Sequence, residues 1–213
     1  MDNLSFLNTE TNKIKTLNIV KDGIEKDLTI DEIFDSNKYE NLIAVTYSVS
    51  ASFVNRYLND FKDSEIIIGI DNDMVKNTIN KLAKNLKNNI KNNLQGEPIK
   101  FYKELNVKSK KKLDDKTLNI LVSNTHIIHS KFYIMWNSNT NENRIVLGSA
   151  NLSNVAFKND SNQFENVMIF DNNDEMFNIY LKYYKESISK VLTEYIPKDL
   201  LKINTKKIKS LKD

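Results

Sequence analysis

Residues 125–136 read THIIHSKFYIMW, and the part from His129 to Trp136 predicts a β-strand in the interior of a sheet. Its apolar and aromatic side chains fall on both alternating faces, which is typical of a strand that is covered on both sides. The same reasoning predicts further short strands. They are expected at 41–49, 65–70, 99–104, 117–123, 144–148 and 165–170.

Helical patterns separate several of these strands. Ser50 is suited to cap a helix whose apolar face carries Phe53, Val54, Tyr57, Leu58 and Phe61. Apolar residues at helical spacing predict further helices at 71–94 and 174–192. Alternating strands and helices predict an α/β fold in which helices cover both faces of a mixed central sheet. We expect one domain over 1–196 and a Lys-rich tail or linker over 197–213.

Composition excludes several classes of protein. The 213 residues include no cysteine, which excludes a disulfide scaffold and a thiolate metal site. The hydrophobic fraction of 40% is sufficient for a core, but no apolar run is long enough to span a membrane. The first residues lack the pattern of a secretory leader, so the expected location is the cytoplasm. The net charge of +3 is too small to identify a partner.

The strand at 129–136 also carries the first candidate for chemistry. His129 and Lys131 are two residues apart, so an extended chain presents both side chains on one face. A lone histidine in apolar surroundings is usually structural, but an imidazole beside an ammonium group can bind a phosphate. The ammonium can hold its oxygens while the imidazole attacks or transfers a proton.

A second cluster follows in LGSANLS at 147–153. Gly148 permits a close backbone approach, and Ser149 and Asn151 share a face as neutral hydrogen-bonding groups. Glu165 opens the next strand, where a carboxylate can accept the second N–H of an imidazole and fix its tautomer.

Together HSK at 129–131, GSAN at 148–151 and Glu165 in QFEN resemble the catalytic half-motif of the phospholipase D superfamily, above all its nuclease branch. TYSVSASF at 46–53 resembles the first strand and helix of bacterial phospholipase D-like domains. The resemblance implies an α/β/α sandwich. One departure is Trp136, which stands where the superfamily has an aspartate that is mainly structural.

The resemblance also implies a role for each residue. His129 is the expected nucleophile and forms a phosphohistidine, while Lys131 and Asn151 hold the phosphate oxygens. Ser149 supports that site and Glu165 orients His129. Neither a metal nor another cofactor is expected.

Such chemistry needs two histidines, and the chain has one HxK motif. His126 lacks a lysine two residues on, and on an extended strand it would face away from His129. The superfamily's solution is a pair of half-motifs at a two-fold axis, so we expect a homodimer with a composite active site. Alternatively, the chain is a piece of a longer protein with a second half-motif, or is fused to or associated with an ATPase or helicase module.

The favoured function is therefore a metal-independent phosphodiesterase that cleaves nucleic acid, DNA in preference to RNA, in bacterial or phage defence, restriction or repair. The charged segment 108–116 is expected to be a loop, in which Lys110, Lys111 and Lys112 contact the phosphate backbone. One alternative is a phospholipase with the same chemistry, although the sequence shows no amphipathic membrane anchor. Another is a non-catalytic module for nucleic-acid binding or dimerisation.

Overall fold

The computed structural model describes residues 14–69, 97–123 and 125–196. Its strands are β1 (Leu17–Lys21), β2 (Ile24–Glu25), β3 (Asn41–Thr46), β4 (Asp63–Ile68), β5 (Leu118–Ser123), β6 (Phe132–Trp136), β7 (Asn143–Gly148), β8 (Glu165–Asp171) and β9 (Leu192–Glu194). Its helices are α1 (Ile30–Ile33), α2 (Ala51–Phe53), the π-helix η1 (Val54–Leu58), α4 (Glu97–Glu104), α5 (Val107–Asp114), α6 (Asp174–Glu186) and the 3₁₀-helix η2 (Ile188–Val191).

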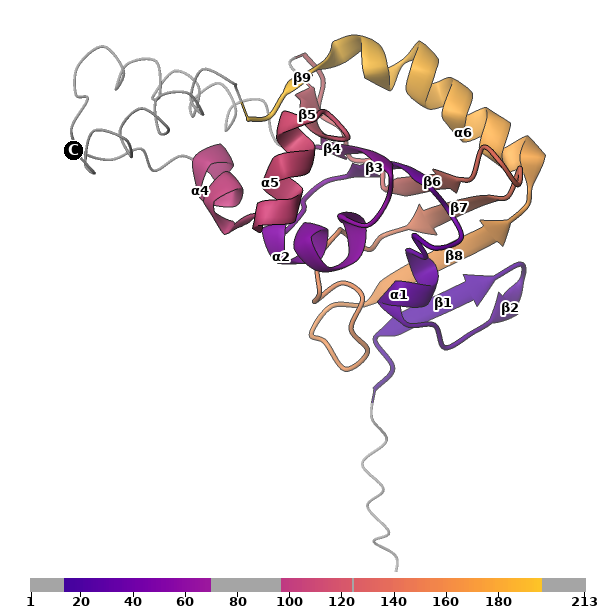
Figure 1. Ribbon diagram of the computed structural model, residues 1–213. Helices are drawn as coiled ribbons and strands as arrows, with labels where there is room; N and C mark the ends of the chain where they lie inside the picture. Colours follow the sequence, from indigo (N-terminus) through magenta and orange to yellow (C-terminus); the bar gives the residue numbers. More distant parts are fainter. Residues whose placement is uncertain (1–13, 70–96, 124, 197–213) are drawn as a thin grey trace, which may run out of the picture.

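One mixed sheet contains all the described strands, in the order β2-β1-β8-β7-β6-β3-β4-β5-β9 (Figure 1). β3, β4 and β5 run parallel to one another, whereas β6, β7 and β8 follow as antiparallel neighbours beside β3. β1 pairs with β8 in parallel. The predicted mixed α/β architecture is confirmed.

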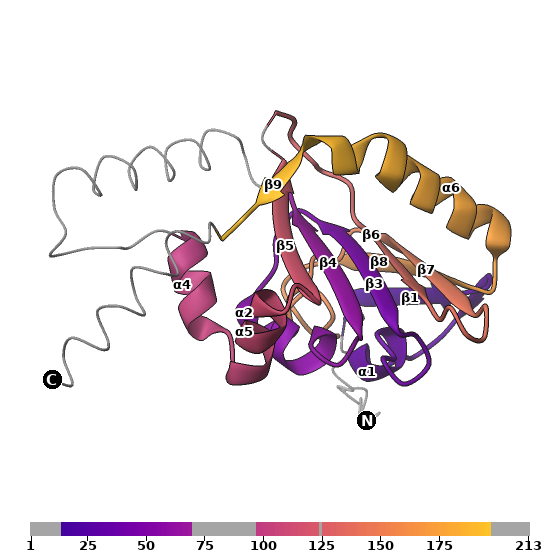
Figure 2. The same ribbon diagram turned by 45° about the horizontal axis from the view of Figure 1, so that its top comes forward.

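Helices cover both faces of this sheet, as Figure 2 shows. α6 lies on one face, where its Tyr180 ring packs 5.1 Å from the ring of Phe132 in β6. α1, α2, α4 and α5 lie on the other face, where the buried core includes Tyr133, Phe53 and Phe101. Trp136 packs edge-on against Phe177 of α6, so the residue at the superfamily's aspartate position belongs to the α6 side of the core.

The helix after β3 begins as predicted. The Ser50 side chain accepts a hydrogen bond from the backbone N–H of Phe53, which makes Ser50 the N-cap of α2. The chain continues directly into η1, and Phe53, Val54, Tyr57 and Leu58 are all buried.

Two predictions about the segment before β5 are wrong. Residues 99–104 belong to helix α4, where Pro98 fits the first turn and the backbone N–H of Leu105 bonds to the carbonyl of Phe101. Residues 108–116 are mostly helix α5 and not a loop, because Asn106 caps the N–H of Ser109 and lysine is a good helix former.

Other elements differ at their ends. β6 begins at Phe132, so His129 and Lys131 precede the strand. The helix predicted at 174–192 ends at Glu186 and is followed by η2 and β9, and β1 and β2 occupy a region whose sequence showed no clear pattern. The helix predicted at 71–94 and the tail at 197–213 lie outside the described residues. In the described parts of the chain, every helix is too short or too polar to cross a membrane.

Candidate active site

The strand register brings the predicted site residues to one end of the sheet. Val45 of β3 pairs with Phe132 of β6, Phe132 pairs with Leu147 of β7, and Gly148 pairs with Val167 of β8. Because these neighbours are antiparallel, β3 and β7 end where β6 and β8 begin. We call this the site end of the sheet, and the residues after β3, before β6, after β7 and at the start of β8 all meet there.

Tyr47, His129 and Lys131 form an aromatic and cationic group at the site end. The rings of Tyr47 and His129 are stacked, with centroids 5.1 Å apart and an angle of 22° between their planes. The Nζ atom of Lys131 lies 5.9 Å from the centroid of the Tyr47 ring. Sequence reasoning missed Tyr47, because the predicted strand at 41–49 placed it inside the strand, whereas β3 ends at Thr46.

Gly69 supports the connection that carries His129. A Cβ atom at Gly69 would lie 1.8 Å from the backbone carbonyl oxygen of Ile128, so only glycine permits this approach. The backbone N–H of Gly69 also bonds to the carbonyl of Thr46, at 2.8 Å. Gly69, directly after β4, therefore fixes the position of the 125–131 connection next to the end of β3.

Ser149 and Glu165 are joined directly. The Ser149 hydroxyl donates a hydrogen bond to Oε2 of Glu165 and accepts one from the backbone N–H of Asn166, at 3.0 Å. Gly148 permits this arrangement, because a Cβ there would lie 2.0 Å from the carbonyl oxygen of Asn166. The predicted close backbone approach at Gly148 is confirmed.

Asn151 is held by its carbonyl oxygen. Its Oδ1 accepts hydrogen bonds from the backbone N–H of Ser48 at 3.2 Å and from the Thr46 hydroxyl at 3.3 Å. Because the N–H of Ser48 can only donate, the amide atom that faces it must be the oxygen Oδ1. The Nδ2 group of Asn151 therefore points away from Ser48. No described residue accepts a hydrogen bond from Nδ2, which leaves two donors for a ligand.

Tyr133 fixes the backbone between Ser149 and Asn151. Its buried hydroxyl donates to the carbonyl oxygen of Ala150. Burial raises the pKa of Tyr133 above its ordinary value, which keeps the hydroxyl protonated as a donor. Tyr133 is two residues after Lys131, so strand alternation could have indicated that it lies beneath the site.

The structure does not bring every predicted residue together. Among the described contacts, no hydrogen bond joins Glu165 to His129, and the orienting role of Glu165 stays a prediction. Lys110 donates to the carbonyl of Lys103 at 3.1 Å, and Lys112 donates to the carbonyl of Phe61.

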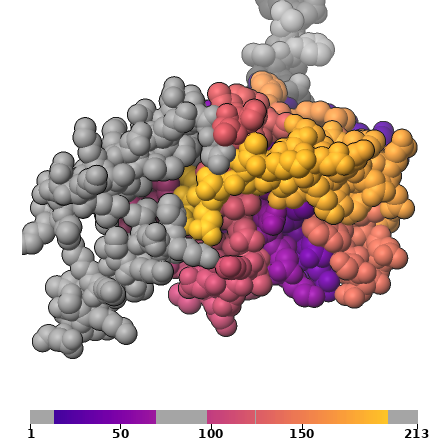
Figure 3. Space-filling view, turned by 90° about the horizontal axis from the view of Figure 1, so that it is seen from above, coloured from indigo at the N-terminus to yellow at the C-terminus, as the bar shows by residue number. Residues whose placement is uncertain are grey.

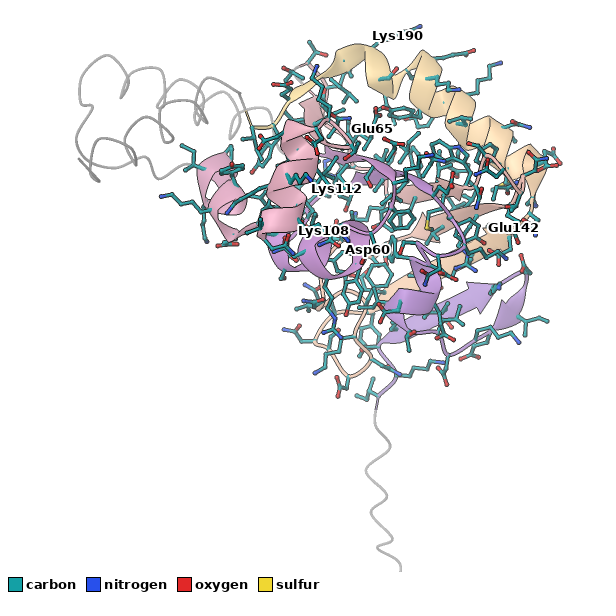
Figure 4. The ribbon with its side chains drawn as sticks, in the orientation of Figure 1. Asp60, Glu65, Lys108, Lys112, Glu142 and Lys190 are labelled. Carbon is teal, nitrogen blue, oxygen red and sulfur yellow. The ribbon has the colours of Figure 1, made fainter. Side chains whose placement is uncertain are left out.

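These lysines lie far from the site end. Phe61 precedes β4, whose first residues are at the opposite end of the sheet, and Figure 4 shows Lys112 on α5 with Lys108 beside Asp60. Burial lowers the pKa of Lys112. Lys111 is exposed, and its contact with phosphate stays a prediction.

His126 and His129 belong to one connection that precedes β6. Residues 125–131 have no described strand structure, and both histidines are among the residues that line one pocket. The side-chain alternation of an extended strand, which is the reason to expect His126 to face away from His129, therefore does not apply to this segment. The Nδ1 atom of His126 is 2.7 Å from the Thr125 hydroxyl. Within the described ranges, no three His, Asp or Glu side chains are grouped as a metal site would require.

Comparison with protein families gives one match. Residues 53–198 match the family described as the NgoFVII restriction endonuclease N-terminal PLD domain, where PLD denotes phospholipase D. The matched range includes every predicted residue of the half-motif, from His129 to Glu165, whereas Tyr47 precedes it. A search of curated proteins finds no match.

Proposed function

The chain belongs to the family of the NgoFVII restriction endonuclease N-terminal PLD domain, and on that premise we propose that it is a nuclease that cleaves DNA. The observation that carries this proposal is the meeting of His129, Lys131, Asn151 and the Ser149–Glu165 pair at one end of the sheet. An imidazole, a cation and an amide donor are the groups that a phosphodiester in hydrolysis requires. The expected setting is restriction or defence against phage in the cytoplasm.

The proposed reaction has two steps and uses no metal. An imidazole nitrogen of His129 attacks the phosphorus, the P–N bond forms, and the P–O bond to one sugar breaks. An acid donates a proton to the departing oxygen. In the second step, the conjugate base of that acid takes a proton from water, and the water oxygen attacks the phosphorus of the phosphohistidine. The P–N bond breaks, which restores His129 and releases a phosphomonoester.

Lys131 and Asn151 stabilise the charge on the non-bridging oxygens. Asn151 suits this role because its Oδ1 is held by Ser48 and Thr46, which presents its Nδ2 group in one orientation. Donors that are fixed before the reaction stabilise the transition state without a cost of reorganisation. Glu165 orients His129, and Ser149 holds the Glu165 carboxylate.

The acid of the first step is His129 of a second copy. We assign it to a homodimer because the chain has a single HxK motif and the exposed site end leaves His129 accessible. An ATPase or helicase module, fused or associated, would deliver the DNA. Exposed Lys111 would contact the backbone of the same DNA molecule at a distance from the cleaved bond.

Cleavage of labelled single- and double-stranded DNA and RNA in excess EDTA tests the proposal. We expect the wild type to cut DNA and His129→Ala to be inactive, with Ile179→Ala, on the exposed surface of α6, as the control that retains activity. Cleavage that disappears with EDTA would contradict the metal-independent mechanism. Failure to cut any nucleic acid, with hydrolysis of phosphatidylcholine instead, would replace the nuclease by a phospholipase, and inactivity on both would favour a binding module.

A further inference from the structure

A pocket of about 270 Å³ adjoins His129 on the side of the sheet that α6 covers. The connection 126–130 forms one wall, and Tyr183, Ser187, Ile188 and Val191 form the other. Figure 3 looks onto this side of the molecule, where α6 crosses as a ridge and the connection lies beside its C-terminal end. His129 thus borders both the candidate active site and this pocket.

The walls combine flat apolar surface with hydrogen-bonding groups. Tyr183 is 45% exposed and Ile127 is 52% exposed, so both present apolar surface that the chain itself does not cover. The Tyr183 ring packs 6.0 Å from the Phe132 ring, which fixes its position. Ser187 contributes a hydroxyl, and His126 has a second ring nitrogen beyond the one that contacts Thr125.

The helical wall carries net positive charge, because three lysines outnumber the exposed carboxylate of Glu186. Lys182, Lys185 and Lys190 are exposed on the turns of α6 and η2 that carry Tyr183 and Ser187. Figure 4 shows Lys190 extending from the end of this wall into solvent. Exposed ammonium groups next to an aromatic face are typical of surfaces that bind single-stranded nucleic acid.

We propose that this pocket is a nucleobase subsite, which holds the base of the nucleotide next to the cleaved phosphodiester by stacking on Tyr183. The inference rests on the proposed function, because His129 can reach the phosphate only if the adjoining nucleoside lies beside it. A base has a flat face for Tyr183 and polar edges for Ser187 and His126. An acyl chain offers no hydrogen-bonding groups and would leave these polar groups without partners. The volume is slightly below that of pockets for drug-sized ligands, which suits a single base.

Binding and cleavage of one probe test the subsite separately from the reaction. The probe is a short single-stranded DNA oligonucleotide with 2-aminopurine beside the cleaved bond, and its fluorescence falls when the base stacks. Tyr183→Leu keeps apolar packing on Phe132 but removes the aromatic face, and Tyr183→Phe restores that face. Ile179→Ala is the matched control, because Ile179 is 52% exposed on α6 and does not line the pocket.

We expect Tyr183→Leu to lose the fluorescence quenching and to weaken binding about tenfold, while Tyr183→Phe and Ile179→Ala behave as the wild type. Replacing the probed base by an abasic site should weaken wild-type binding but leave Tyr183→Leu unchanged. Quenching that persists in Tyr183→Leu would overturn the subsite, even if the protein cleaves DNA. Tyr183-dependent quenching without any cleavage would support the subsite and contradict the nuclease. The absence of both quenching and cleavage in the wild type would overturn both.

Discussion

The phenol ring of Tyr47 lies nearly parallel to the imidazole of His129, with 5.1 Å between their centroids. Tyr47 follows β3 and His129 precedes β6, so the stacked pair joins the ends of two neighbouring strands. Lys131 approaches the same ring, with its Nζ atom 5.9 Å from the centroid. Tyr47 is therefore placed to position both the predicted nucleophile and the predicted phosphate-binding lysine.

Replacing Tyr47 is expected to affect turnover more than binding. Tyr47→Leu should lower kcat about two- to tenfold, because an aromatic pair contributes about 0.5–1.5 kcal/mol. Tyr47→Phe should retain kcat, since the ring and not the hydroxyl makes the contact. The ring-current shift of the His129 ring protons in NMR spectra provides a readout besides activity. A Tyr47→Leu variant with wild-type kcat and an unchanged His129 shift would show that the stacking has no positioning role.

Lys131→Ala should nearly abolish cleavage while the fold is retained. The charge serves the phosphate, and loss of one such stabilising group typically costs about 10²–10³ in kcat. Circular dichroism and thermal unfolding would verify the fold. Lys111→Ala is the matched control, because it removes one positive charge from the exposed surface of α5, away from the site end. It should raise KM modestly without changing kcat. Equal effects of the two variants would contradict the assignment of Lys131.

Much of this site was predictable from the sequence because strand alternation and local motifs are short-range properties. HSK and GSAN place His129, Lys131, Ser149 and Asn151 at strand ends, and the observed register brings these ends together. The contact between Ser149 and Glu165 was not predicted, because it depends on how β7 and β8 pair. Tyr47 was missed for a similar reason: its partner lies far along the chain.

The errors in the fold have local physical causes. IKFYKE at 99–104 alternates apolar and polar residues like a strand, yet Phe101 and Leu105 at helical spacing place it in a helix. The lysines of α5 resemble a charged loop, but Ser109 is fully buried and capped by Asn106. In both segments tertiary packing determined the outcome, and a single sequence does not show it.

Glu165→Gln tests the carboxylate that opens β8. The Ser149 hydroxyl donates to Glu165, so the amide retains an acceptor oxygen but loses the negative charge. We expect kcat to fall at least tenfold, about 1.4 kcal/mol in activation free energy, because the imidazolium of His129 loses its counter-charge. Glu142→Gln is the matched control, since Glu142 pairs with Lys38 at the β6–β7 turn, away from the site end. Unchanged kcat in Glu165→Gln would contradict the orienting role.

A composite active site makes a specific prediction about mixed oligomers. Light scattering should give twice the mass of one chain. Excess His129→Ala is added to the wild type and subunits are allowed to exchange. The activity per wild-type chain should then fall, because each mixed dimer has one His129 side chain instead of two. Activity that follows dilution alone, or a monomeric mass at working concentration, would contradict the shared site. Adding excess Ile179→Ala, which should retain activity, controls for the exchange itself.

The buried pair of Arg144 and Asp171 predicts an acid-dependent loss of stability. Arg144 is only 5% exposed and contacts both carboxylate oxygens of Asp171, at 2.5 and 2.8 Å, and Lys21 lies 2.8 Å from the same group. Burial would raise the pKa of Asp171, but the hydrogen bonds and charges of Arg144 and Lys21 outweigh it and lower the pKa to about 2. The pKa is thus lower in the folded than in the unfolded protein. Ionised Asp171 therefore contributes about 2 kcal/mol to the free energy of unfolding above pH 4, and this contribution is lost as the pH falls toward 2.

Chemical denaturation between pH 6 and pH 2 measures this contribution. The wild type should lose stability mainly below pH 4, whereas Asp171→Asn should be less stable at pH 6 and less dependent on pH below 4. Asp160→Asn is the control, because Asp160 forms an exposed pair with Lys158 that contributes little to stability. A wild type and an Asp171→Asn variant with parallel stability curves would show that the ion pair does not couple folding to protonation. The pair also joins β7 to β8 and, through the carbonyl of Ile33, to α1, so its loss should loosen the end of the sheet opposite the site end.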